Sequence, residues 1–264
     1  MGGAEGAGPE PMKAISTGRF PPLAAFAAYA FIASLAPLSA QAATQAAAPP
    51  STADASTNIM TADQYFQEVS DRYTQINDYS CKLTISTGKA TMIGNLIYRA
   101  PSLLRIDFTS PPDQVIAFDG QTLQVYIPEY HAVLSQSVST ASGSAGAGLA
   151  TREGLKMMKR NYGIAFETSP DPVVLSGGTE KVVRLVLTRK TVAEGFRTIT
   201  VSVAADSKLI RRLEGTTLAN ENFTFDFTGM KLNQNIPEGR FIYDSPASAN
   251  VYNNFLFNSA ASGN

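Results

Sequence analysis

Alternation of apolar and polar residues between positions 98 and 133 is the feature that most constrains how this chain can fold. Leu104, Ile106 and Phe108 alternate with charged Arg105 and Asp107, as expected for a strand with one apolar face. Two more rows follow at the same spacing, Gln114, Ile116 and Phe118 and then Leu123, Val125 and Ile127. Pro111-Pro112-Asp113 and the hairpin signal Asp119-Gly120 separate the rows, so the segment predicts successive antiparallel strands.

The second half of the chain continues this period-two pattern. Its apolar rows are Val183, Leu185 and Leu187, then Ile199, Val201 and Val203, and finally Phe223, Phe225 and Phe227. Turn residues lie between them, at Gly177-Gly178, Glu194-Gly195 and Asp206-Ser207. We therefore predict a mainly β fold of about ten or eleven strands, a strongly curved antiparallel sheet or incomplete β-barrel. Phe241, Tyr243 and residues 251–257 are expected to form the last edge segment.

Two short helices are predicted in addition to the strands. Thr61 lies three residues before Gln64, a capping-box pattern that starts a helix ending at Asn77-Asp78. The second helix is expected to start at Thr151. Each has an apolar stripe that must cover another apolar surface; the stripes are Tyr65, Phe66, Val69, Tyr73 and Ile76, and Leu155, Met158 and Tyr162.

A run of small residues from Ser135 to Ala150 separates the first strands from the second helix. Such Gly/Ser/Ala-rich segments are usually spacers. The alternative is that the run is the hinge of a movable cover, and the residues alone favour neither reading.

The amino end has the pattern of a cleaved signal peptide over residues 1–42. Lys13 and Arg19 precede the apolar run 23–36, which is too short to span a bilayer, and Ala40-Gln41-Ala42 fits a small-x-small cleavage signal. Met12 is an alternative start, and an uncleaved membrane anchor is the alternative role. Residues 43–58 consist mainly of Ala, Pro, Ser and Thr and predict a disordered linker, so 59–264 is expected to be a single domain.

Composition argues against several classes of function. A formal charge of -1 offers no basic surface for nucleic acid, and only 16% of the residues are charged. Cys81 is the one cysteine and His131 the one histidine, so we expect no disulfide, metal site or other cofactor. We also expect no enzymatic activity, because the sequence has no nucleophile, zinc or nucleotide motif. Apolar residues are 44% of the chain, enough for a core with apolar surface left over.

The order of the strand and turn motifs also resembles a known family. An aromatic-basic-x-Pro strand end at Tyr98–Pro101 precedes the strand 103–108, and Pro111-x-x-Gln114-Val115 follows. The pattern Asp119-Gly120-x-x-Leu123-x-x-Tyr126-x-Pro128 completes the segment. This order is similar to that of the periplasmic lipoprotein carriers of the LolA family, whose superfamily includes LolB-like and other lipid-binding proteins.

The resemblance implies an incomplete barrel with a helical lid over a cavity that holds acyl chains, whereas the residues alone favour a fully packed core. The sheet residues expected to line the cavity are Leu104, Ile106, Phe108, Ile116, Phe118, Leu123, Val125, Phe223 and Phe225. The lid residues would be Phe66, Val69, Tyr73, Leu155 and Met158.

The resemblance further implies a monomeric periplasmic chaperone in outer membrane biogenesis. Its partners would be acylated lipoprotein cargo, an inner-membrane lipoprotein-releasing ABC transporter and a LolB-like outer-membrane acceptor. A free-lipid carrier and a lipoprotein-sensing regulatory module of the same fold are the alternatives.

One position departs from the family pattern. Carriers of this family have an arginine directly before the proline that ends the second strand, and it bonds the lid to keep the cavity shut. Here Ala100 occupies that position and Arg99 lies one residue earlier. Arg99 is our candidate for the lid lock, but a one-residue shift turns a strand side chain to the other face unless a bulge compensates.

Overall fold

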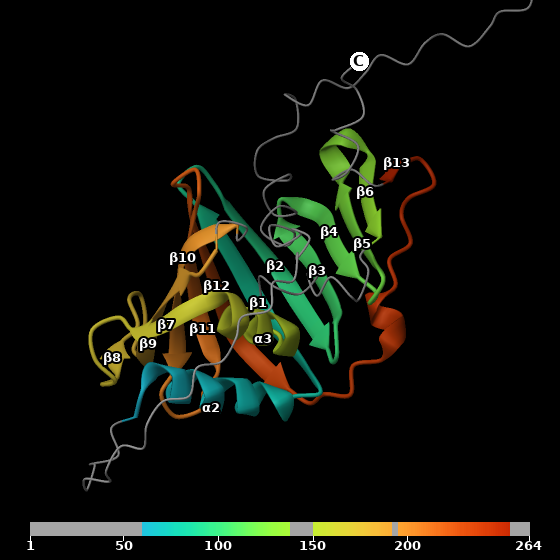
Figure 1. The fold of residues 1–264 in the computed structure, drawn as a ribbon. Helices are drawn as coiled ribbons and strands as arrows, with labels where there is room; N and C mark the ends of the chain where they lie inside the picture. The colour runs from blue at the N-terminus through green and yellow to red at the C-terminus, as the bar shows by residue number, and fades with distance from the viewer. Residues whose placement is uncertain (1–59, 138–149, 192–194, 254–264) are drawn as a thin grey trace, which may run out of the picture.

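A curved thirteen-stranded sheet forms the body of the chain in the computed structural model, which describes residues 60–137, 150–191 and 195–253 (Figure 1). The sheet order is β13-β6-β5-β4-β3-β2-β1-β12-β11-β10-β9-β7, with β8 paired to β9. Strand β1 joins the two halves by pairing with both β2 and β12. The predicted fold class, a curved and incomplete barrel with few helices, is confirmed.

The first half of the sheet is a meander of six strands. They are β1 (Asp78–Thr87), β2 (Thr91–Arg99), β3 (Leu103–Ser110), β4 (Pro112–Phe118), β5 (Thr122–Ile127) and β6 (Ala132–Ser137), with a 3-10 turn η1 (Pro128–Tyr130) before β6. The connection after β4 has three residues rather than the two expected from Asp119-Gly120. Oδ1 of Asp119 accepts hydrogen bonds from the backbone N–H groups of Gln121 and Thr122, and Gly120 takes a φ of 96°.

The second half of the chain contributes seven strands. They are β7 (Tyr162–Phe166), β8 (Val173–Val174), β9 (Lys181–Arg189), β10 (Phe196–Ala204), β11 (Ile210–Thr217), β12 (Asn222–Leu232) and β13 (Asn250–Asn253). The sheet has more than the expected ten or eleven strands because it includes two short ones: β8, with two residues, and β13, which pairs in parallel with β6. Neither gives a period-two signal, since each is too short to alternate more than once or twice.

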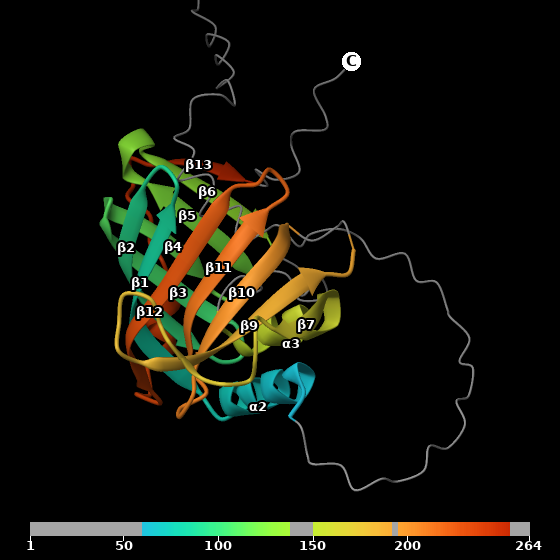
Figure 2. The ribbon, with the colours of Figure 1, turned by 90° about the vertical axis from the view of Figure 1, so that its left-hand side faces the viewer.

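Two helices lie at the same end of the sheet, beside β7 (Figures 1 and 2). Helix α2 (Ala62–Thr74) begins at the predicted capping box, in which the side chains of Thr61 and Gln64 accept from each other's backbone N–H at 3.2 and 2.8 Å. It ends three residues before Asn77, earlier than expected. Helix α3 (Arg152–Asn161) is capped by Thr151 as predicted. Tyr162 is the first residue of β7, not the last turn of the helix, although its side chain is buried as expected.

A segment after β12 crosses the outer face of the sheet, the face that points away from the helices. We call residues 233–249 the strap; it contains the 3-10 turn η3 (Glu238–Phe241). Phe241 packs with Ile97 and Ile236, while Tyr243 and Ala249 pack against outer-face residues of β4–β6. The prediction that Phe241 and Tyr243 belong to the edge strand is therefore wrong: they lie in the strap, and the described edge strand is Asn250–Asn253.

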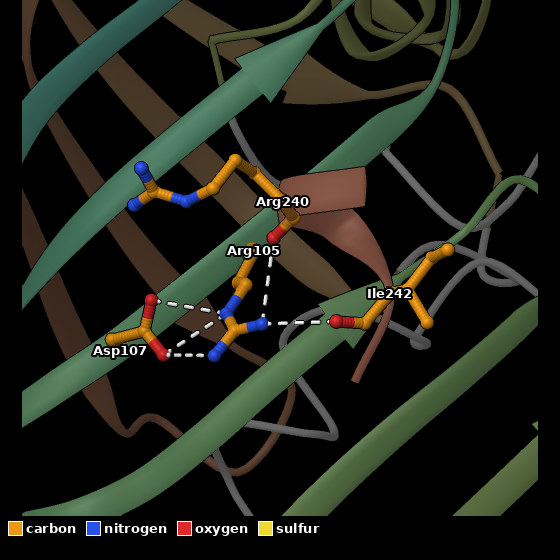
Figure 3. Close-up of polar contacts among 4 residues, drawn as sticks. All are labelled: Arg105, Asp107, Arg240 and Ile242. Atoms are coloured by element: carbon orange, nitrogen blue, oxygen red, sulfur yellow. Dashed lines mark hydrogen bonds and ion pairs between the residues drawn. The ribbon is translucent and has the colours of Figure 1, made fainter. Parts of the chain in front are cut away.

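Arg105 of β3 holds the strap to the outer face (Figure 3). Its guanidinium forms a two-pronged pair with Asp107 at 2.8–3.0 Å, and Nη1 donates to the backbone carbonyl of Ile242 at 3.0 Å and that of Arg240 at 3.4 Å. It also lies 5.7 Å from the ring centroid of Tyr243. One side chain thus connects the sheet to both backbone and side chain of the strap.

Candidate functional site

The structure brings together every sheet residue predicted to line an acyl-chain cavity. All belong to one hydrophobic cluster on the inner face, and none is more than 5% exposed. They come from four strands, β3, β4, β5 and β12, and β2 and β1 lie between β3 and β12 in the sheet. These residues are Leu104, Ile106, Phe108, Ile116, Phe118, Leu123, Val125, Phe223 and Phe225.

The predicted lid residues join that same cluster. Phe66, Val69 and Tyr73 project from α2, and Leu155 and Met158 from α3; all five are buried. Because both helical stripes pack against the inner face, lid and sheet form one apolar body in this conformation. Any ligand of the inner face would have to replace contacts between these helices and the sheet.

Polar contacts attach α2 to the turn between β10 and β11. The Ile210 backbone N–H donates to the Tyr73 hydroxyl at 3.1 Å. Lys208 forms an ion pair with Glu68 at 3.0 Å, and its ammonium lies 3.7 Å from the centroid of the Tyr65 ring. The second helix is attached differently: the Tyr79 hydroxyl of β1 donates to the carbonyl of Ala150, just before α3, at 2.9 Å.

Arg152 joins the two helices to each other. From the first turn of α3 its Nε donates to the carbonyl of Tyr73 at 3.0 Å, and its Nη2 donates to that of Ile76 at 2.6 Å. These carbonyls lie at the C-terminal end of α2, where backbone oxygens lack helical partners and favour a cation. Sequence reasoning missed Arg152, since its only local signal is a position next to the helix cap.

Arg99, the predicted lid lock, lies on the opposite side of the sheet. Its guanidinium donates to the carbonyl of Ile236 and pairs with Glu238 at 3.4 Å, both in the strap. Tyr98, one residue earlier, points into the inner cluster. The alternation of strand side chains therefore turns Arg99 outward, so the expected lock contact is not made in this conformation.

The tyrosine hydroxyls and the thiol within the inner cluster are neutral. Burial raises the pKa of the Tyr73, Tyr79 and Tyr98 hydroxyls well above their usual range, and it raises the pKa of the Cys81 thiol to about 12. Cys81 thus behaves as a small buried apolar residue. Among the described residues there is no cluster of three or more His, Cys, Asp or Glu that could hold a metal ion. The arrangement suits an uncharged, apolar ligand.

Comparison with protein families adds an independent observation. The family model of the outer membrane lipoprotein carrier protein LolA matches residues 66–244, more than half of the chain. This protein belongs to the LolA family. The match runs from α2 to the middle of the strap and so includes both helices and β1–β12. A search of curated proteins finds no match.

Several solved structures resemble this LolA-family chain in fold. An uncharacterized conserved protein from Thermus thermophilus is 13% identical, with a TM-score of 0.48 over 71% of this chain and 98% of that one. A LolA superfamily protein from Nitrosomonas europaea is 12% identical, with a TM-score of 0.36 over 70% and 99%. The MucA/MucB complex of Pseudomonas aeruginosa is 12% identical, with a TM-score of 0.45 over 72% and 63%. At these identities the likeness concerns the fold alone.

In the part of the chain that the structure describes, no helix is long and apolar enough to cross a membrane. The expected signal peptide and linker and most of the Ser135–Ala150 run lie outside the described residues.

Proposed function

We propose that this LolA-family protein is a periplasmic carrier that holds the acyl chains of lipoproteins between the inner face of its sheet and helices α2 and α3. It would accept cargo from an inner-membrane ABC transporter and deliver it to an outer-membrane acceptor. The observation that carries the proposal is the single apolar cluster shared by the predicted cavity and lid residues. It is a carrier rather than an enzyme in this proposal.

The energetics of an apolar site suit such a carrier. Each buried methylene of an acyl chain contributes about 0.8 kcal/mol, so part of one chain gives useful affinity. The ligand must first replace the contacts between helices and sheet, and this cost keeps binding reversible. Arg152 sets part of that cost, because separating α3 from α2 breaks its two charge-assisted hydrogen bonds.

An Arg152→Met variant tests whether opening of the helices limits loading. Loss of both hydrogen bonds should increase the open population, and we expect a roughly tenfold tighter apparent binding of a fluorescent fatty acid. Arg160→Met is the matched control, because Arg160 is an exposed residue of the same helix whose guanidinium contacts the neighbouring Asn161 side chain. Equal affinities in both variants and the wild type would show that α2 and α3 do not gate the site.

Cargo identity is tested by purifying the protein from its native envelope and analysing what accompanies it by mass spectrometry. Triacylated proteins are expected for a lipoprotein carrier. Free lipids alone would favour the alternative of a lipid carrier, and one unacylated envelope protein would favour a sensing module. Amino-terminal sequencing of the same sample should give a start near Ala43 if the signal peptide is cleaved as predicted.

A further inference from the structure

Gln114 is a polar exception on the inner face of β4. Counting by twos along the strand places it on the same face as Ile116 and Phe118, which belong to the inner cluster. Val115 and Ala117 belong to the outer-face cluster. Extending the Val115–Tyr126 pairing places Gln114 opposite Ile127, which is also an inner-cluster residue. Its side chain is only 2% exposed. A primary amide is thus buried on the strand face that carries the inner cluster.

The amide of Gln114 is not satisfied there. Its Nε2 is buried and has no hydrogen-bond partner in the part of the chain that the structure describes. An unpaired buried donor is costly, and folded proteins leave few of them without a reason. The other buried glutamine of this half, Gln136, has a partner, because its Nε2 donates to the carbonyl of Ser137.

The backbone around Gln114 is irregular in a way that directs this side chain. Asp107 pairs with Val115 and Thr109 with Pro112, so two residues of β4, Asp113 and Gln114, lie opposite one residue of β3. Asp113 adopts a left-handed conformation with φ of 60°. Such bulges re-aim a side chain and are common beside binding sites. The turn motif at Pro111–Val115 thus places a free N–H donor on the apolar face.

We propose that Gln114 donates a hydrogen bond to the carbonyl oxygen of an acyl ester or amide in the cargo, and so selects acylated ligands over plain hydrocarbon. This inference rests on the proposed function. The donor is neutral, so it matches a carbonyl better than a carboxylate or a cation. A carbonyl at the head of an apolar chain would satisfy Nε2 while the chain occupies the surrounding cluster.

The experiment compares two ligands that differ in one carbonyl group, 1-palmitoylglycerol and its ether analogue 1-O-hexadecylglycerol, by displacement of a fluorescent hydrocarbon probe. The wild type should bind the ester about fivefold more tightly, as one neutral hydrogen bond predicts. Gln114→Met, an apolar residue of similar shape, should bring the ester-to-ether ratio close to one by weakening only the ester. Gln124→Met is the control, because Gln124 lies on the outer face of β5 beside Tyr126 and should keep the wild-type ratio.

The outcomes separate the two proposals. If the wild type displaces the probe with neither ligand, the carrier function itself fails. If both ligands bind equally well, or if Gln114→Met keeps the preference, the carrier stands and the role of Gln114 is overturned. Infrared spectroscopy of bound carbonyl-labelled 1-palmitoylglycerol needs no variant: the carbonyl band should shift to lower frequency on binding, and an unshifted band would also overturn the inference.

Discussion

The two halves of the outer face differ in polarity. On β9–β12 a cross-strand row runs through Arg184, Ser202, Arg212 and Asp226, with ion pairs from Arg212 to Asp226 at 2.6 Å and from Arg184 to Glu214 at 3.1 Å. On β4–β6 the corresponding surface is apolar, made by Val115, Ala117, Tyr126 and Val133. The β9–β12 half therefore presents charged side chains to water.

The β4–β6 half requires a cover, and the strap provides it. Tyr243 and Ala249 pack on the apolar patch, and the chain then pairs with β6 as β13. The strap thereby covers the apolar face, and β13 covers the β6 edge, which would otherwise attract other chains. The comparison teaches that an additional segment is needed where the outer-face side chains are apolar, and not where they are charged.

The largest expected effect is at the aromatic anchor of the strap. Phe241→Ala should lower the free energy of unfolding by about 3 to 5 kcal/mol, because the buried ring fills the space between Ile97 and Ile236. Urea unfolding measures the change. Ile242→Ala, at an adjacent side chain that is 62% exposed, should stay within about 0.5 kcal/mol of the wild type. A cost for Phe241→Ala as small as this would mean that the strap adds nothing to stability.

Arg105→Ala should have the next largest effect, about 1.5 to 2.5 kcal/mol, since it removes charge-assisted bonds to the strap and leaves Asp107 unpaired. Protease cleavage within the strap should become faster at the same time. Arg105→Lys keeps the charge but not the planar fork, so we expect an intermediate loss. An unchanged cleavage rate in Arg105→Ala would show that packing alone holds the strap.

Arg212→Ala tests the β9–β12 half and should cost less, about 0.5 to 1 kcal/mol, because its ion pair joins two neighbouring strands and, among the described residues, attaches no further segment to the sheet. The same urea unfolding assay applies. Raising the salt concentration should reduce the difference from the wild type. If Arg212→Ala were as costly as Arg105→Ala, the two halves would not differ in the way proposed.

Tyr243→Phe should have the smallest effect on stability at neutral pH, because the Tyr243 hydroxyl changes its charge only in alkaline solution. Burial against Tyr126 raises the pKa of the Tyr243 hydroxyl to about 12, above the value of about 10 in an unfolded chain. The contribution is complete below pH 10 and is lost as the pH rises toward 12, because the unfolded state gives up its proton first. Between these values the wild type should lose more stability than Tyr243→Phe. Equal losses of stability in the two proteins between pH 10 and 12 would contradict the raised pKa of Tyr243. The other buried tyrosines titrate in both proteins, so their effect cancels in the difference.

The parts of the fold predicted correctly are those encoded by nearby residues. Alternation placed β3, β4, β5, β9, β10 and β12, and the Thr61–Gln64 pair placed the start of α2, because strand faces and helix caps depend on spacings of two to four residues. The inner-face residues followed from the same alternation, and all nine were found together.

The contacts that escaped prediction join distant positions. Arg99 could be assigned to a strand end, but its partners Ile236 and Glu238 lie more than a hundred residues away. The role of Arg152 could not be predicted from a sequence pattern, because its acceptors are backbone carbonyls, which every residue has. The strap was mistaken for an edge strand because a segment that covers a sheet without pairing has no period of its own.

By itself, the sequence determined that this chain forms a curved, mostly antiparallel sheet with one apolar face and two helices able to cover it. Those properties follow from the spacing of apolar and polar residues within each segment, whichever segments later pack together. The tertiary structure alone decided that Arg152 joins the helices, that Arg99 and Arg105 hold the strap, and that Gln114 has no partner. Such outcomes depend on closing loops of many residues, and the direction of each side chain is set only once its strand has found its register.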